Sequence, residues 1–562
     1  MRIETYDFSE TGRSLVKGSD KGADWPVVYM IAGDSEAYIG ETCSIGNRFS
    51  QHLANEERRK LKRICIILDD QFNKSAVLDI EQSLIQLCGA DGKFKLQNQN
   101  SGQSSKHNYY QREIYANKLP DIWSELIRLG LAKHDLDFIR NSNLFKYSPY
   151  TALTPEQTEV SNEVVMGIVE SIESGNHGAA IINGSAGTGK TVLAINMMFS
   201  LVSASRGATD PSEIIEGFTD EQLAIHELRR IVKERGPLDV ALVVPMTSIR
   251  KTLQKVFKAT GNGLKSSMVI GPFDAAKKHY DVLFVDESHR LARRANISNM
   301  GDFDDTCRKL GMDPETSTQL DWIVRSSDYQ VLFYDQEQTV RGSDITPEQL
   351  ASTLPEYDRY DLVTQLRCRG GDDYIHYLER IFECRQARHQ EVLDYDLRIF
   401  DDADEMVQAI RRLDSEIGLS RNVAGYSWKW RTKGMTSEAV KESGLYDIEI
   451  GPYRYVWNMS NVEWILRPES ADEIGCIHTT QGYDLNYVGV IFGPEIDYDE
   501  ETNRITVDPS KYYDINAKKG TDPETVRRYV INAYRVLMTR GIKGCYVYAC
   551  NDCLKSYLKQ YI

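Results

Sequence analysis

Short apolar runs alternate with amphipathic segments along this chain, and the alternation predicts an α/β fold. In the first hundred residues, the apolar runs that predict strands lie at 27–31, 37–40 and 63–68. A Gly-Asp turn joins the first two as a hairpin. Helical spacing follows at 45–59 and 75–88. Farther along, buried strands typical of a parallel sheet are predicted at 180–182, 240–245, 282–285 and 330–334.

The chain has 562 residues, more than one hydrophobic core can serve, and this length predicts roughly three or four domains. A polar stretch at 99–110, dense in Ser, Gln and Asn, marks the end of the first domain. We expect a small α/β domain, a helical adaptor and two larger parallel-sheet domains, at 1–105, 106–150, 151–350 and 351–562. Segments 207–238 and 429–470 interrupt the larger domains and predict lids or an inserted subdomain.

Composition excludes some classes of protein and leaves nucleic-acid binding open. No run of eighteen apolar residues occurs, the first residues lack the apolar core of a signal peptide, and the ten cysteines are too scattered for a disulfide framework. These features predict a cytoplasmic protein without a membrane span. The close pair Cys550 and Cys553 is interpreted as buried thiols rather than a zinc or redox site. A net charge of −16 argues against coating nucleic acid, although a local basic groove remains compatible with it.

The segment 184–191, GSAGTGKT, fits the phosphate-loop pattern G-x-x-x-x-G-K-[ST] and lies between a predicted strand and a predicted helix. Its candidate ATP-binding residues are Gly184, Gly187, Thr188, Gly189, Lys190 and Thr191. Glycines let successive backbone N–H groups converge on a phosphate, and the helix N-terminus favours negative charge. The lysine would reach the β- and γ-phosphates, and the Thr191 hydroxyl would ligand Mg²⁺. The segment predicts that the protein binds a nucleoside triphosphate.

A pair of acids, Asp286 and Glu287, follows the apolar run at 282–285. Such pairs are common after strands, but a central parallel strand next to a phosphate loop delivers them to the nucleotide. Asp286 would hold Mg²⁺, and Glu287 would orient and polarise the attacking water. Arginines far along the chain, Arg367 and Arg540, make sense as cations that a second domain supplies to the transferring phosphoryl group.

The order of these motifs resembles superfamily 1 helicases, and more closely an uncharacterised helicase-like family related to Schlafen helicase halves. The closer resemblance rests on the stretches at 286–290, 364–368, 424–428 and 534–541. It covers about residues 150 to 562 and implies two RecA-like parallel-sheet domains. It implies that Gln157 reads adenine, that Gln338 couples hydrolysis to movement, and that Arg367 and Arg540 are arginine fingers. Gln481 and Gly482 would link the nucleotide to a nucleic-acid strand. The motif around Gln338 lacks the usual glycine before its aspartate.

The N-terminal hundred residues carry a second set of polar candidates. Arg48 and His52 lie four residues apart on one face of a predicted helix. Glu81 is flanked by apolar positions of the next helix, where a carboxylate is costly unless it meets a cation or hydrogen-bond donors. The alternatives are that Glu81 reaches water at the edge of the apolar stripe and that His52 is an ordinary surface histidine. The basic run at 58–63 is either a solvated face or a track for a nucleic-acid backbone.

In order and spacing, Tyr29, Tyr38, Arg48, His52, Glu81 and Asn98 resemble the GIY-YIG nucleases, although Val-Val-Tyr replaces the first Gly-Ile-Tyr. The resemblance covers about residues 25 to 100 and implies phosphodiester hydrolysis with a divalent metal, Mg²⁺ or Mn²⁺, on Glu81. Either tyrosine would activate water or orient the phosphate once the metal and Arg48 lower its pKa. Arg48 would clamp a phosphate oxygen, and His52 would shuttle a proton or contact phosphate.

Together these features predict an ATP-dependent nucleic-acid translocase or helicase fused to an endonuclease, with DNA favoured over RNA as its partner. Restriction of foreign DNA in anti-phage defence is a setting suggested by architecture alone. Two alternatives stay open: an ATP-gated nuclease clamp without unwinding, and a DNA-repair adaptor whose nuclease domain is inactive. The tryptophans at 428, 430, 457 and 464 are interpreted as core rather than as stacking platforms, and an oligomer is compatible with the sequence.

Overall fold

The computed structural model describes the chain except for residues 19–23, 99–108, 152, 186, 205–219, 262, 296, 298, 336–341, 365–367, 387, 393, 461–463, 481–482 and 519–520. The chain divides into two compact units. One contains residues 1–170, 191–240 and 253–269, and the other contains 171–190, 241–252 and 270–562. No helix within the described ranges is both long and apolar enough to cross a membrane.

A five-stranded sheet forms the N-terminal domain, in the order β1-β4-β2-β3-β5. Its strands are β1 (Arg2–Asp7), β2 (Val27–Ala32), β3 (Glu36–Thr42), β4 (Arg63–Leu68) and β5 (Lys95–Leu96). The predicted hairpin is confirmed, because β2 and β3 pair antiparallel with Tyr29 opposite Gly40. The apolar pattern missed β1, an edge strand whose sequence RIETYD is mostly polar and partly exposed.

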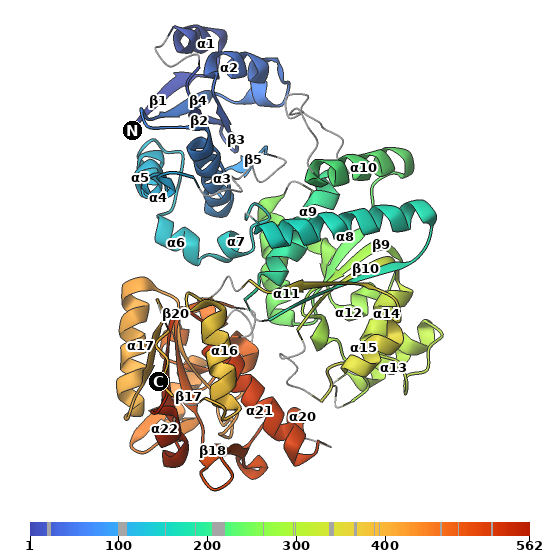
Figure 1. Cartoon of the computed structure of the whole chain (residues 1–562), viewed down its shortest axis with the longest axis vertical. Coiled ribbons are helices and arrows are strands. Elements are labelled where there is room, and N and C mark those ends of the chain that lie inside the picture. The colour runs from blue at the N-terminus through green and yellow to red at the C-terminus, as the bar shows by residue number, and fades with distance from the viewer. Residues whose placement is uncertain are drawn as a thin grey trace. The chain divides into compact units, whose positions relative to one another are not determined.

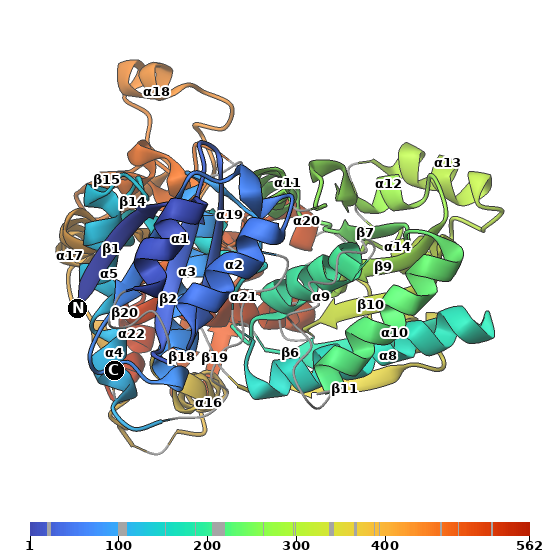
Figure 2. The ribbon, with the colours of Figure 1, turned by 90° about the horizontal axis from the view of Figure 1, so that it is seen from above.

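Helices α1 (Glu10–Lys17) and α2 (Ile45–Ala54) lie side by side in this domain, and α3 (Lys74–Asp91) packs on β2 and β3 (Figure 2). The prediction that the helix beginning at Ile45 reaches residue 59 was wrong, because α2 ends at Ala54. The Asn55 side chain accepts hydrogen bonds from the backbone N–H groups of Glu57 and Arg58, which ends α2 and starts a separate turn. The adaptor is helical as predicted, and α3 contacts three of its helices, α4, α6 and α7. The adaptor comprises α4 (Arg112–Ala116), α5 (Leu119–Arg128), α6 (Leu136–Asn141) and α7 (Asn143–Lys146).

The second sheet has six strands, in the order β11-β6-β10-β9-β7-β8. They are β6 (Gly178–Gly184), β7 (Val240–Val243), β8 (Val269–Ile270), β9 (Tyr280–Val285), β10 (Ser327–Tyr334) and β11 (Asp358–Leu362). Strand β10 pairs parallel with both β6 and β9, so their carboxyl ends meet at one edge. The helices of this region are α8 (Pro155–Ser174), α9 (Lys190–Ala204), α10 (Asp220–Arg235), α11 (Thr247–Thr260), α12 (Pro272–Ala275), α13 (Met300–Lys309), α14 (Gln319–Arg325) and α15 (Pro347–Thr353).

The third sheet is parallel throughout, in the order β12-β20-β17-β13-β16. Its strands are β12 (Asp396–Ile399), β13 (Ser420–Ala424), β16 (Ile474–Gly475), β17 (Leu485–Phe492) and β20 (Gly541–Ala549). Successive residues of β20 point to opposite faces of the sheet and pack in two hydrophobic cores. Cys545 and Val547 share a core with α21 (Pro523–Met538), while Tyr546 and Tyr548 share a core with α17 (Ala403–Ile417). Figure 1 shows these two helices on opposite faces of the sheet. Both faces are therefore covered, as the predicted mixed α/β class with parallel sheets requires.

Smaller elements complete this region. The helices are α16 (Gly371–Phe382), α18 (Ser437–Ser443), α19 (Ile477–Thr480), α20 (Ile515–Lys518) and α22 (Asp552–Leu558). Two antiparallel hairpins pair β14 (Ile448–Ile450) with β15 (Tyr453–Tyr455) and β18 (Ile496–Asp499) with β19 (Arg504–Val507). The first hairpin and α18 lie within the predicted insertion at 429–470.

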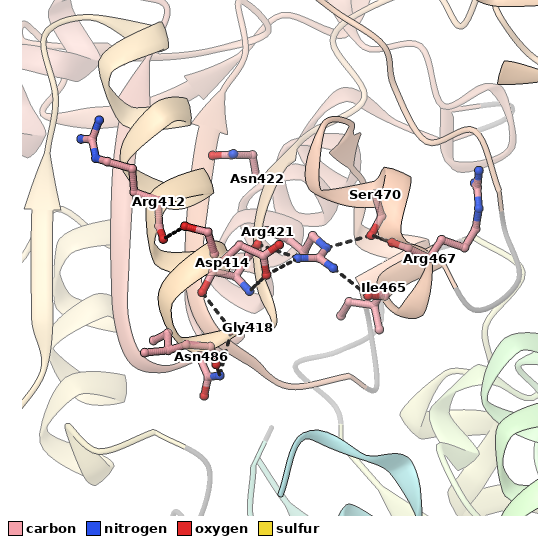
Figure 3. A network of polar contacts seen from close by, with 12 residues as sticks. Arg412, Asp414, Gly418, Arg421, Asn422, Ile465, Arg467, Ser470 and Asn486 are labelled. Carbon is pink, nitrogen blue, oxygen red and sulfur yellow. Dashed lines mark hydrogen bonds and ion pairs between the residues drawn. The ribbon is translucent and has the colours of Figure 1, made fainter. Parts of the chain in front are cut away.

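A buried arginine ties the end of α17 to β13 and to the turn at 468–471 (Figure 3). The Arg421 guanidinium contacts the Asp414 carboxylate at 2.5 Å, donates to the Ser470 hydroxyl at 2.8 Å and donates to the Ile465 carbonyl at 3.1 Å. The same carboxylate accepts from the Ser420 backbone N–H, so it caps the strand as well as pairing with the arginine. This network holds the end of α17 in place against β13 and the turn at 468–471.

Candidate functional sites

The phosphate loop connects β6, which ends at Gly184, to α9, which begins at Lys190. Gly187 and Gly189 have φ values of 99° and 80°, in the left-handed region that favours glycine. Thr188 is buried, and its hydroxyl donates to the Ser185 carbonyl at 3.1 Å. Thr191 is the second residue of α9, where a hydroxyl stands at the helix N-terminus. The strand, the turn and the helix therefore occur where the motif requires them.

Lys190 is held inside the loop rather than extended into solvent. Its Nζ donates to the Ser185 carbonyl at 2.9 Å and to the Asp335 carboxylate at 3.3 Å, and it also contacts the Gly184 carbonyl. Asp335 follows β10, the strand next to β6, so its carboxylate comes from the same sheet edge. An ammonium group held by carbonyls and one carboxylate can exchange these partners for phosphate oxygens.

The acidic pair lies at the end of β9, and the turn that carries it is anchored on both sides. The Asp286 backbone N–H donates to the Val243 carbonyl at 3.0 Å, and its carboxylate accepts from the Glu287 N–H at 3.1 Å. Glu287 has a φ of 51°, an uncommon conformation for a side chain of this size. Beyond it, Arg290 forms a buried ion pair with Asp344 at 3.0 Å. The surrounding contacts hold Glu287 in a conformation that it would not adopt by itself.

The environment of Glu287 keeps its carboxylate ionised. Burial would raise the pKa of Glu287, but the close contact with His289 and the charges of His289, Lys190 and Arg290 lower this pKa below its ordinary value. Nε2 of His289 lies 3.0 Å from Oε2 of Glu287. An ionised carboxylate beside the phosphate loop has the charge state that orienting a water molecule requires.

Among the other predicted nucleotide-site residues, the structure describes Gln157 and Arg540. Gln157 forms a capping box at the start of α8: its side chain accepts from the Thr154 N–H, and its own N–H donates to the Thr154 hydroxyl. Arg540 is buried between α21 and β20, and its Nε donates to the Val536 carbonyl at 3.1 Å. Gln338, Arg367, Gln481 and Gly482 lie outside the described residues.

In the N-terminal domain, four of the predicted residues come together from β2, β3 and α2. The Tyr29 hydroxyl lies 2.6 Å from Nε2 of His52 and accepts from Nε of Arg48 at 3.2 Å. The Tyr38 ring is 4.9 Å from the His52 ring. Both Tyr29 and His52 are fully buried, so His52 is not the ordinary surface histidine of the alternative interpretation.

In the protein without a metal, the pKa of Tyr29 is raised, so Arg48 by itself does not lower it. Burial and the neighbouring Tyr38 raise the pKa of Tyr29 well above its ordinary value, and Arg48 offsets this only in part. A buried phenol surrounded by apolar strands loses the solvation that its anion needs. Without further cations at the site, Tyr29 is a neutral phenol.

Glu81 is buried on α3, which removes the alternative that it reaches water. Burial and the charge of Glu41 raise the pKa of Glu81 to about 8, while Lys74 and Arg48 lower it in part. A buried carboxyl group in this state gains from a divalent cation. No cluster of three or more His, Cys, Asp or Glu side chains suited to a metal occurs among the described residues. Proteins often bind Mg²⁺ through one or two carboxylates together with several water molecules, and a single buried carboxyl group such as Glu81 is compatible with that mode of binding.

Asn98 has a structural place beside this cluster. Its side-chain amide accepts from the Ile39 N–H at 3.0 Å and donates to the Ile39 carbonyl at 2.8 Å. These two bonds pair the edge of β3 as another strand would. The position of Asn98 thus holds the strand that carries Tyr38.

Arg58 is a member of the site that the sequence interpretation did not single out. Its guanidinium carbon lies 3.9 Å from the centroid of the Tyr38 ring, and its Nη1 lies 2.9 Å from Nδ1 of His52. In the sequence it is one residue of a basic run, while its exposed neighbour Arg59 has the same charge. Only the end of α2 at Ala54 turns Arg58 toward the site.

The remaining candidates have structural explanations. Trp457 and Trp464 are buried in the core, as predicted, and Trp428 and Trp430 are partly buried. Cys550 is partly buried and Cys553 is exposed, so the expectation of two buried thiols was wrong for Cys553, which lies at the start of a terminal helix with its side chain in solvent.

Several known proteins are similar to parts of this chain. An uncharacterized protein of Saccharomyces cerevisiae, YPL245W, is 24% identical over 420 residues, which cover 67% of this chain and 83% of that protein. Among solved structures, a DNA replication initiation factor is 13% identical, with a TM-score of 0.20, covering 42% of this chain and only 53% of its own. The Pif1 helicase from Candida albicans is 11% identical, with a TM-score of 0.24, covering 73% of this chain and 99% of its own.

The family comparison is more specific, and it covers both parallel sheets. The Schlafen group 3, DNA/RNA helicase domain matches residues 177–551, about two thirds of the chain. The match includes the phosphate loop and the acidic pair, and it supports a helicase-like ATPase. The N-terminal sheet and the adaptor precede it. The chain belongs to the family of the Schlafen group 3, DNA/RNA helicase domain.

Proposed function

We propose that this protein is an ATP-dependent nucleic-acid translocase or helicase coupled to a metal-dependent endonuclease. The motor half is supported by the phosphate loop and the ionised Glu287 within a helicase-family match. The nuclease half is supported by one observation above all: Tyr29, Arg48 and His52 meet through hydrogen bonds in the same small domain that buries Glu81.

For the ATPase, Lys190 would leave the loop carbonyls and bind the β- and γ-phosphates. Thr191 and Asp286 would hold Mg²⁺, which supplies charge stabilisation for the phosphoryl group. Glu287 would orient the attacking water, because its left-handed backbone and its contact with His289 fix the direction of the carboxylate. Arg367 and Arg540 remain proposed arginine fingers, and Gln157, Gln338, Gln481 and Gly482 remain proposed contacts to the nucleotide or its coupling to the strand.

For the nuclease, Arg48 would bind a phosphate oxygen while keeping its hydrogen bond to Tyr29. Glu81 would hold Mg²⁺ or Mn²⁺, which supplies Lewis-acid stabilisation of the leaving oxygen. The proposed nucleic-acid partner is DNA, with RNA as the alternative. By analogy of architecture, the proposed setting is cleavage of foreign DNA.

The ATPase proposal is tested with Lys190→Ala in the full-length protein. ATP hydrolysis should fall to background, because the phosphates lose their principal cation. Lys309→Ala, an exposed lysine at the end of α13, is the matched control and should hydrolyse ATP like the wild type. Equal rates for Lys190→Ala and the control would contradict the motor assignment.

The nuclease proposal is tested with Glu81→Ala on single- and double-stranded DNA and RNA in Mg²⁺ and in Mn²⁺. Cleavage should stop while ATP hydrolysis continues, because Glu81 lies in the separate N-terminal sheet domain. Glu56→Ala, an exposed acid in the same domain, should cleave like the wild type. No cleavage of any substrate by the wild type would favour the adaptor with an inactive nuclease domain.

A further inference from the structure

The hydrogen bonds around His52 determine which of its two ring nitrogens carries the proton. Nη1 of Arg58 lies 2.9 Å from Nδ1 of His52. A guanidinium group has only N–H donors and stays protonated in proteins, so it cannot accept a hydrogen bond. Nδ1 of His52 must therefore be the acceptor, and it carries no proton in this arrangement.

The other ring nitrogen then has a fixed role. A neutral imidazole with an unprotonated Nδ1 carries its proton on Nε2. Nε2 lies 2.6 Å from the Tyr29 hydroxyl oxygen, so His52 donates to this oxygen. Arg48 donates to the same oxygen from Nε at 3.2 Å. The Tyr29 oxygen thus accepts two N–H hydrogen bonds, one of them from a cation.

We propose that Arg58 is a positioning residue of the nuclease site, which holds His52 in the Nε2–H tautomer and so makes His52 a donor to Tyr29. This inference rests on the proposed nuclease function. It changes the role of His52, because an imidazole whose Nδ1 is occupied by Arg58 and whose Nε2 is protonated cannot take the phenol proton. Negative charge on the Tyr29 oxygen is instead stabilised by His52 and Arg48 together.

The position of Arg58 is well defined. Its guanidinium lies over the Tyr38 ring at 3.9 Å, so the cation is held by an aromatic face as well as by the hydrogen bond to His52. The Asn55 side chain accepts from the Arg58 backbone N–H and fixes the turn that follows α2. Arg58 therefore connects the second tyrosine of the site to the histidine, while Arg48 and His52 connect to the first.

The tautomer is measured directly in the full-length protein with ¹⁵N-labelled histidine. Long-range ¹H–¹⁵N correlation distinguishes protonated from unprotonated ring nitrogens, and the spectrum of His52→Gln identifies the His52 signals. We expect the wild type and Arg59→Ala to show an Nε2–H imidazole. Arg58→Ala should lose this preference, and Arg58→Lys should restore it, because an ammonium group also donates to Nδ1. Thermal melting verifies that each variant folds.

Cleavage assays with the same proteins connect the tautomer to function. Arg58→Ala should cut about tenfold to a hundredfold more slowly, as expected when a catalytic group is misplaced. Arg58→Lys should recover much of the rate, and Arg59→Ala should match the wild type. A wild-type His52 protonated on Nδ1, or an Arg58→Ala protein with unchanged tautomer and cleavage, would overturn the inference. A wild type that shows the Nε2–H tautomer but never cleaves nucleic acid would overturn the nuclease function and leave the role of Arg58 in fixing the tautomer standing.

Discussion

Glu495, which lies between the end of β17 and the start of β18, shows how burial changes the chemistry of a single side chain. Its Oε1 accepts from the Tyr534 hydroxyl at 2.7 Å, and its Oε2 has no hydrogen-bond partner among the described residues. Gly493 lies beside both this oxygen and the Ser427 hydroxyl, which also has no hydrogen-bond partner among the described residues. Burial raises the pKa of Glu495 to about 7, although the bond from Tyr534 lowers it in part. A neutral carboxyl group suits this position better than an anion.

This pKa predicts how stability depends on pH. Because the pKa of Glu495 is raised in the folded state, the unfolded chain ionises first as pH rises. Its stabilising contribution is therefore complete below pH 4.5 and is lost as pH rises through about 7, by on the order of 3 kcal/mol. Glu495→Gln should raise the free energy of unfolding at pH 8 and flatten this dependence, as measured by urea denaturation. Glu500→Gln, an exposed neighbour, should leave the profile unchanged, and a flat wild-type profile would contradict the prediction.

For single residues, the sequence predicted the residue types and their order along the chain better than it predicted their chemical roles. Tyr29, Arg48, His52 and Glu81 were chosen from spacing, and the structure buries Glu81 and brings the other three into contact. The pKa of Tyr29 depends on how deeply its hydroxyl is buried and on the nearby Tyr38 and Arg48, which spacing along the chain cannot express. Arg58 was missed because its direction depends on where α2 ends.

At the scale of elements, the pairing of β2 with β3 explains the glycine in Tyr38-Ile39-Gly40. Gly40 lies opposite Tyr29, and a Cβ at Gly40 would lie 2.4 Å from the Tyr29 hydroxyl oxygen and 2.6 Å from Cζ. No side chain fits between this strand and the tyrosine ring. The glycine therefore sets the distance between a strand and the ring that carries the hydroxyl.

We predict that Gly40→Ala abolishes cleavage and leaves ATP hydrolysis unchanged. The added methyl group must displace the Tyr29 ring, at a cost of about 1–3 kcal/mol in stability, and this separates Tyr29 from His52 and Arg48. Gly301→Ala is the control, because a Cβ there would meet nothing within 4 Å. Cleavage by Gly40→Ala at the wild-type rate would show that the position of Tyr29 is not essential.

The network around Arg421 makes a second prediction for elements. Arg421→Ala should lower the free energy of unfolding by about 3–5 kcal/mol, because it leaves the Asp414 carboxylate without its cation between α17 and β13. Arg412→Ala is the control, an arginine on the helix that carries Asp414, since only the backbone carbonyl of Arg412 joins the network (Figure 3). Chemical denaturation compares the two, and equal stabilities would contradict this role for Arg421.

At the scale of the whole molecule, the central question is how the ATPase affects the nuclease. If ATP hydrolysis drives movement along nucleic acid, a nuclease-inactive Glu81→Ala protein should displace a strand with ATP and fail with a non-hydrolysable analogue. If ATP only gates the nuclease, the analogue should support cleavage by the wild type. Strand displacement should then be absent with ATP and also with the analogue. Strand displacement by Glu81→Ala and cleavage by the wild type are measured on the same labelled duplex. Lys190→Ala should fail in both assays under either mechanism.

The sequence by itself determined seven strands of the first two sheets, the phosphate loop with its acidic pair, and the residue types of both candidate sites. These features are local, since a strand-to-helix turn with glycines at fixed positions needs only neighbouring residues to form. Tertiary structure decided the rest: the polar edge strand β1, the burial of Glu81 and the contact of Arg58 with His52. Each of these depends on segments distant in the chain or on where a helix ends, because burial and hydrogen-bond partners are properties of packed neighbours and not of sequence spacing.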